Sequence, residues 1–174
     1  MSLREQTLRR RVLTCAWVIV IGLVLSGVTA LPLQHELDLL ARMFHAGDLS
    51  PAEAKSDLVR WILVVRDGLH ETYAKFPFIG YGTDWLAFGH IVIAIAFVGV
   101  LQHPLRNSWL FTFGMIACVL VLPFALIAGE VRDIPVFWRF IDCSFGVFGF
   151  IPNWLGHKWT RELEQMRAAS LRFD

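Results

Sequence analysis

Charged residues are scarce in this sequence. Asp, Glu, Lys and Arg make up 18% of its 174 residues, whereas an ordinary soluble domain contains about 25%. The few charges nearly cancel, to a formal net charge of +1 at pH 7. This balance argues against a nucleic-acid-binding protein, which needs a basic surface. Cysteine is rare as well, and the three cysteines include no Cys-x-x-Cys pair, so neither a disulfide framework nor a thiol-redox motif is indicated.

Apolar residues are abundant instead, at 56% of the chain, and they gather in long blocks. A helix needs about 20 residues to cross a bilayer. The first block, 12–32, and three blocks within 83–156 reach this length, at about 84–102, 109–129 and 135–156. The sequence therefore predicts an all-α polytopic membrane protein with four transmembrane helices in a bundle, and the lipid bilayer as its surroundings.

The first block has a second interpretation. An Arg-rich start, an apolar run and the sequence Val28-Thr29-Ala30 are also typical of a secretory signal with a cleavage site. The apolar run is longer than the usual signal, which favours a retained helix. Cleavage would leave three spans and place the new N-terminus outside.

Lys and Arg are distributed unevenly between the two sides of these spans. Basic residues near the span ends mark the cytoplasmic side. Nine of the 16 lie in the stub 1–11, in the connection after the second block and in the tail 157–174. They are Arg4, Arg9, Arg10, Arg11, Arg106, Lys158, Arg161, Arg167 and Arg172. Both termini are therefore predicted to be cytoplasmic, with residues 33–82 outside.

The outer segment 33–82 has the pattern of two helices. Apolar residues recur at helical spacing from Gln34 to Ala46, and again from Ala54 to Phe76. Between them, Ser50-Pro51-Ala52-Glu53 is a capping box that predicts a helix start. We expect an extracytoplasmic amphipathic helical cap. Its apolar face could lie on the membrane or over the outer mouth of the bundle, or it could dock onto a partner membrane protein.

Ionisable residues within the spans are candidates for a functional site, because a charge at membrane depth is costly and normally has a partner. Arg139 and Asp142 are three apart, so they share a helix face and could pair. His90 lies at about the depth of Asp142. The three predict a polar pocket in the outer half of the bundle, or a structural ion pair with a hydrogen-bonded His. The expected rim consists of Asp84, Glu130 and Arg132.

Histidines at span ends raise the alternative of b-type haem, which four-helix membrane cytochromes bind through paired His. His103 and His157 both end spans on the cytoplasmic side and could pair. His90 could pair only with His35, which is expected at the outer end of the first span. However, His90 and His103 are 13 residues apart, which turns them about 220° from one another around a helix. Stacked haems need both on nearly one face, so no cofactor is the favoured expectation, and no metal site is predicted.

Small residues recur where helices would touch, because close approach replaces hydrophobic attraction between helices in lipid. Gly146 and Gly149 would open a groove in the fourth span, and Gly89 and Gly99 would do so in the second. Gly22, Ser26 and Ala30 have the same role in the first span. These features favour a compact bundle.

Two stretches carry a resemblance. Tyr81 to His90, YGTDWLAFGH, is one, and Gly114 to Cys118 together with Ile141 to Gly146 is the other. They resemble a group of small bacterial membrane proteins that have no assigned activity. The resemblance implies a location in the bacterial inner membrane and transfers no catalytic residue.

Three functions are compatible with the sequence. The absence of a catalytic motif and the patterned outer cap favour a non-enzymatic accessory or assembly subunit, or a small-ligand sensor. An electron carrier that binds haem or quinone is the alternative. A small oligomeric transporter is the second alternative, although no inverted repeat relates the two halves of the chain.

Overall fold

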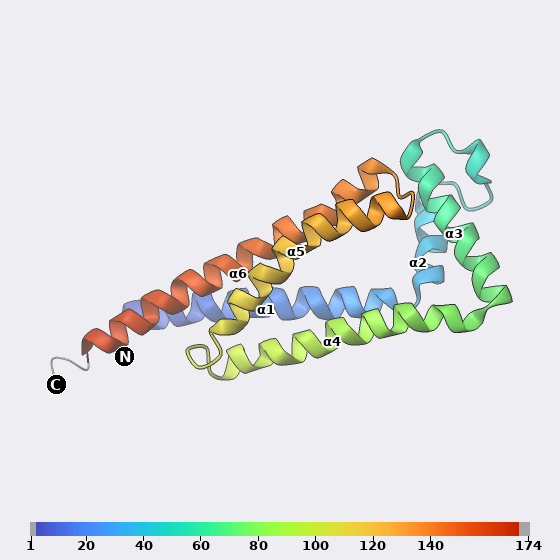
Figure 1. The fold of residues 1–174 in the computed structure, drawn as a ribbon. Coiled ribbons are helices and arrows are strands. Elements are labelled where there is room, and N and C mark those ends of the chain that lie inside the picture. The colour runs from blue at the N-terminus through green and yellow to red at the C-terminus, as the bar shows by residue number, and fades with distance from the viewer. Residues whose placement is uncertain (1–2, 171–174) are drawn as a thin grey trace. The chain divides into compact units, whose positions relative to one another are not determined.

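The computed structural model describes residues 3–170, and within this range it is all-α (Figure 1). Residues 171–174, with Arg172 of the predicted basic tail, lie outside the described residues. The helices are α1 (Leu3–Ala30), α2 (Leu33–Met43), α3 (Asp57–Lys75), α4 (Tyr81–Gln102), α5 (Trp109–Val131) and α6 (Val136–Ser170). Two short 3-10 turns, η1 (Pro51–Glu53) and η2 (Pro77–Gly80), precede α3 and α4.

The chain divides into two compact units. One contains the residues up to Leu23 and from Ile93 onward, and the other is Val24–Val92. The boundaries therefore fall inside α1 and α4, which are continuous helices.

Three helices are long and apolar enough to cross a membrane within the described range: Leu3–Ala30, Pro77–Gln102 and Trp109–Val131. The prediction of four such helices is wrong in this count. The fourth block became part of α6, where Arg139 and Asp142 interrupt the apolar stretch and a charged segment follows in the same helix. α1 also begins at Leu3, so it includes most of the predicted cytoplasmic stub.

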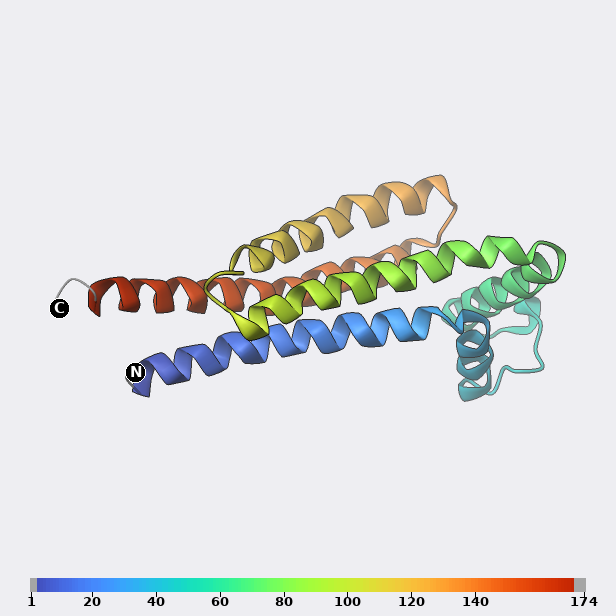
Figure 2. The same cartoon turned by 90° about the horizontal axis from the view of Figure 1, so that it is seen from below.

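In the first unit, α5 and α6 lie side by side and run in opposite directions (Figures 1 and 2). A tight turn joins them. The Asp133 amide donates to Glu130 O at 3.2 Å, and the Ile134 amide donates to Gly129 O at 2.9 Å. Asp133 takes φ 54°. These are the two bonds of a Schellman motif, and they return the chain directly from α5 to α6.

Small residues let α5 and α6 approach closely. A Cβ added at Gly146 would lie 2.6 Å from Cys118 O, and one at Gly156 would lie 2.4 Å from the Phe111 ring. The predicted close packing at Gly146 and Gly149 is confirmed. At Gly22 and Gly89, by contrast, an added Cβ meets no described atom within 4 Å, so the prediction for these two is wrong.

The core of this unit lies between α1, α4 and α5. Its buried residues include Val12, Ala16, Phe97 and Phe111, with the Phe97 and Phe111 rings edge to face at 6.1 Å. Large apolar side chains elsewhere on these helices remain exposed. Such an outward apolar surface is what a lipid environment requires of a spanning helix.

In the second unit, α2 packs against α3 around Ala41, Ala46, Ala54 and Leu63. The capping box at Ser50 forms as predicted, but it opens only the short turn η1. α3 begins later, at Asp57, because the Ser56 side chain caps it by accepting from the Val59 amide at 3.3 Å. The two predicted helices of the outer segment are therefore present, with shorter bounds.

Candidate functional site

The predicted polar cluster is rearranged in the structure. Arg139 donates through Nε to Ile134 O at 2.6 Å and through Nη1 to the Glu130 carboxylate. Its side chain is 13% exposed, whereas that of Glu130 is 75% exposed. The expected Arg139–Asp142 pair is therefore replaced by a pair between Arg139 and a residue predicted for the rim.

Within residues 3–170, the other members of the predicted cluster make no side-chain hydrogen bond or ion pair with Arg139 or Glu130. Among the described residues, no hydrogen bond or ion pair involves the Asp142 carboxylate. His90 belongs to the second unit, where its Nδ1 lies 2.8 Å from Leu86 O, one turn back along α4. Of the remaining rim residues, Asp84 is exposed in the first turn of α4 and Arg132 is exposed at the C-cap of α5. An acid in a first turn is favoured by the helix dipole, which is a structural role.

The candidate haem ligands are spread over several elements. His103 follows the end of α4, and His157 lies in α6 with its Nδ1 3.4 Å from Thr112 Oγ1. His35 lies in α2 and not at the end of the first span, which corrects the placement expected for a pair with His90. Within residues 3–170, no group of three or more His, Cys, Asp or Glu side chains is placed to hold a metal ion.

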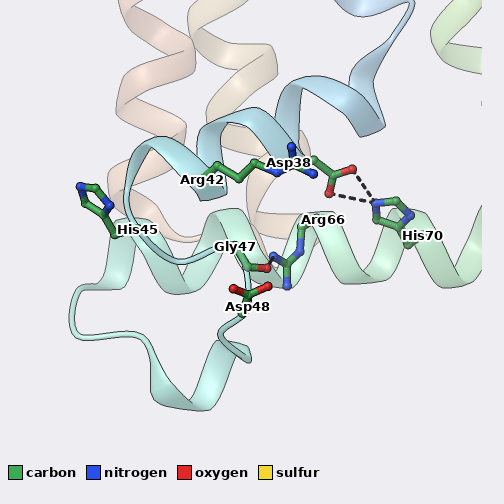
Figure 3. Close-up of a pocket in the computed structure, with 7 residues that line it drawn as sticks. All are labelled: Asp38, Arg42, His45, Gly47, Asp48, Arg66 and His70. Carbon is green, nitrogen blue, oxygen red and sulfur yellow. Dashed lines mark hydrogen bonds and ion pairs between the residues drawn. The ribbon is translucent and has the colours of Figure 1, made fainter.

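A polar pocket lies elsewhere, in the second unit between α2, the loop after it and α3 (Figure 3). Its volume is about 640 Å³. Six of its seven lining residues are ionisable, and they carry both signs of charge. The lining consists of Asp38, Arg42, His45, Gly47, Asp48, Arg66 and His70.

Arg66 holds one wall of this pocket in place. Its Nη1 donates to Gly47 O at 2.8 Å and its Nη2 to Leu49 O at 3.2 Å, while its Nε donates to the Asp67 carboxylate at 2.7 Å. The side chain is only 12% exposed. A planar guanidinium offers donors in fixed directions, so this one side chain can fix two carbonyls of the loop at once.

His70 and Asp38 close the opposite end. The His70 Nε2 lies 3.1 and 3.3 Å from the two carboxylate oxygens of Asp38, which ties α3 to α2 (Figure 3). Nearby, the Gln34 side-chain amide donates to Leu69 O at 3.4 Å. Both contacts join the same pair of helices.

The loop wall begins with the turn that ends α2. His45 takes φ 54°, its amide donates to Arg42 O at 2.9 Å, and the Ala46 amide donates to Ala41 O at 2.8 Å. This is again a Schellman motif. It directs Gly47 and Asp48 back toward α3, where Arg66 binds the loop.

The sequence analysis did not predict this pocket, because the apolar stripes of the two helices gave the prediction and their polar faces were not compared. A signal was present. Asp38 and Arg42 are four apart in α2, and Arg66 and His70 are four apart in α3, so each pair lies on one face of its helix. Two such faces on neighbouring helices could have predicted a shared polar site.

Comparisons of this chain with protein-family models, with curated proteins and with solved structures find no match. What the chain does is therefore inferred from its own residues.

Proposed function

We propose that this is an integral protein of the bacterial inner membrane that has both termini in the cytoplasm and the second unit's α2–α3 module outside. The excess of Lys and Arg at the two termini supports this orientation. We further propose that the first half of α6 crosses the membrane beside α5. It packs along α5, and it exposes Phe140, Phe145 and Phe148 as a spanning helix would.

Cysteine accessibility tests this topology. In intact cells, a membrane-impermeant maleimide should label Asp57→Cys, an exposed position at the start of α3, above the level seen with the unchanged chain. Ala169→Cys, near the end of α6, should react only after lysis. Reaction of Ala169→Cys in intact cells would show that α6 does not cross.

Within this topology, we propose that the protein is non-enzymatic and binds a small polar ligand in the α2–α3 pocket, as a sensor or as an accessory subunit. The observation that carries the proposal is the pocket itself, in which charges of both signs surround about 640 Å³. Arg66 and the His70–Asp38 pair make the hydrogen bonds that hold the walls, and these bonds do not occupy the other ionisable side chains of the lining. Arg42, His45 and Asp48 make no side-chain hydrogen bond or ion pair within the described residues, so they can contact a ligand.

Ligand-induced stabilisation tests this function, because a ligand that binds only the folded protein raises its free energy of unfolding. The probes are acetate, inorganic phosphate, glycine and methylammonium, one for each class of small charged group. At least one should raise the melting temperature. At a concentration of 100 times its Kd, a ligand adds about 2.7 kcal/mol to the free energy of unfolding. Arg42→Gln or Asp48→Asn should remove the effect, and Glu71→Gln, on the exposed side of α3, should keep it. No shift with any probe would contradict the proposal.

An absorption spectrum of the same preparation tests the cofactor alternative. A featureless spectrum above the Trp band, oxidised and dithionite-reduced, is expected. A Soret band with sharp reduced α and β bands would replace this proposal with a b-type cytochrome and direct attention to His103 and His157.

A further inference from the structure

α2 carries more apolar surface than α3 covers. Leu37 and Ala41 are buried, and Ala41 belongs to the core that α2 shares with α3 around Leu63. On other sides of the same short helix, Leu39 is 59% exposed and Met43 is 67% exposed. Leu40 and the C-cap residue Phe44 are exposed as well. The apolar arc of α2 is therefore wide, and about half of it has no partner among the described residues of its unit.

The position of α2 in the chain limits what can cover this surface. Only Leu31 and Pro32 separate α2 from the end of α1, one of the three helices apolar enough to cross a membrane. Two residues span at most about 7 Å. α2 therefore starts at the membrane surface, and Figures 1 and 2 show it crosswise to the end of α1 within the same unit.

The other end of the α2–α3 module is also joined to an apolar helix by a short connection. α3 ends at Lys75, and the turn η2 leads directly into α4, the next apolar helix. Exposed aromatic residues gather at this junction: the Phe76 and Phe78 rings lie edge to face at 6.1 Å, and those of Tyr81 and Trp85 at 5.8 Å. Of these residues, Tyr81 and Trp85 are of the two types that are enriched at membrane–water interfaces.

We infer that the free face of α2, formed by Leu39, Leu40, Met43 and Phe44, is a lipid-binding surface that lies in the headgroup layer of the bilayer. An amphipathic helix in the plane of the interface buries its apolar side among the acyl chains and keeps its polar side in water. Glu36 shares this side in the first turn, where the helix N-terminus stabilises a carboxylate. The polar residues Asp38 and Arg42 lie on the side of the pocket.

Lipid binding by α2 does not depend on ligand binding, but it would set the position of the pocket relative to the membrane. A pocket built on α2 would open close to the headgroups, and α2 would be the element that connects pocket and membrane. A ligand in the pocket would then act on a helix that rests on the lipid.

Methionine methyl NMR tests the inference on the unchanged chain, and a variant is needed only to assign one signal. The chain is labelled with [13C-methyl]methionine in bicelles of phosphatidylethanolamine and phosphatidylglycerol, and the Met43 signal is assigned with Met43→Leu. A doxyl-labelled lipid should broaden the Met43 signal, and a water-soluble gadolinium chelate should leave it unchanged. Met115, inside the apolar helix α5, is the reference for lipid contact.

Two results would overturn it. Broadening of the Met43 signal by the gadolinium chelate would show that the face of α2 lies in water. Protection from both reagents would show that protein covers it, either a second copy of this chain or another subunit. Neither result depends on the small-ligand probes, so this inference and the proposed function can fail separately.

Discussion

Arg139 is bonded to Glu130 across the turn between α5 and α6, and not to Asp142, which lies one helical turn further along α6. The same guanidinium donates to Ile134 O at 2.6 Å. Its methylene groups lie over Gly129, where an added Cβ would come within 2.8 Å of Arg139 Cδ. Arg139 therefore binds the turn at three points, and this is a structural role.

The unequal burial of the two partners predicts unequal effects of mutation. Arg139→Gln should lower the free energy of unfolding by about 1–3 kcal/mol, because it removes a largely buried guanidinium from the part-buried Ile134 carbonyl of the turn. Glu130→Gln should cost about 0–1 kcal/mol, since solvent screens an ion pair whose carboxylate is exposed. Unfolding by SDS titration in mixed micelles measures both.

Asp142→Asn is the control for this pairing. It should change stability less than Arg139→Gln does, because Asp142 makes no bond to Arg139 in the structure. An Asp142→Asn effect as large as that of Arg139→Gln would mean that Arg139 pairs along α6 after all, as the sequence suggested.

Glycine positions on the α5–α6 contact should be sensitive to one added methyl group. Gly146→Ala places a Cβ 2.6 Å from the backbone oxygen of Cys118, which cannot move alone. The helices must separate, at a cost of about 1–3 kcal/mol. Gly22→Ala is the matched control: its Cβ meets nothing described within 4 Å, and alanine should gain up to about 1 kcal/mol of helix propensity. Equal effects in thermal unfolding would contradict the close approach at Gly146.

How far the fold followed from the sequence depended on the kind of signal. Long uninterrupted apolar runs identified α1, α4 and α5, because chain length and apolarity decide this class of helix. The fourth block is not such an uninterrupted run, because Arg139 and Asp142 lie within it. Spacing alone did not show which glycines lie at contacts. Gly22 and Gly146 stand in similar apolar runs, but only an added Cβ at Gly146 would meet another helix.

The candidate site was harder to predict for a physical reason. Arg139 was expected to pair with Asp142 because both lie on one helix. The turn geometry at Asp133 instead brings Glu130 of the preceding helix closer. In the pocket, Arg66 binds the backbone carbonyls of Gly47 and Leu49. Because every residue has a backbone carbonyl, the residue types do not show which ones accept such bonds. Side-chain spacing along one helix therefore did not predict the contacts that Arg139 and Arg66 make with neighbouring elements.

The capping box at the start of η1 should be lost at acid pH, when the Glu53 carboxylate is protonated. Hydrogen bonds from the Ser50 hydroxyl and the Ser50 amide hold the pKa of Glu53 below its ordinary value. The box therefore stabilises the folded form above the unfolded-state pKa of Glu53. That stabilisation is lost as the pH falls through the lower, folded-state pKa.

NMR titration of the Ser50 amide checks this. Its shift should titrate with a pKa below the value of about 4.3 for free Glu. In Glu53→Gln this titration should disappear. Lys55→Gln, also exposed nearby, should leave it unchanged. A midpoint at or above the free value would show that the box does not form in solution.

The loop wall of the pocket should depend on the shape of the Arg66 side chain and not only on its charge. Arg66→Lys keeps the charge, but an ammonium group cannot donate in three fixed directions to Gly47 O, Leu49 O and Asp67 at once. The free energy of unfolding should fall by about 1–3 kcal/mol. Amide hydrogen exchange at Leu49, whose N–H donates to Ala46 O, should become faster. Arg60→Lys is the matched control on the same helix, where the arginine is half exposed and pairs with Asp57. It should leave Leu49 exchange unchanged, and similar exchange in both variants would show that Arg66 does not hold the loop.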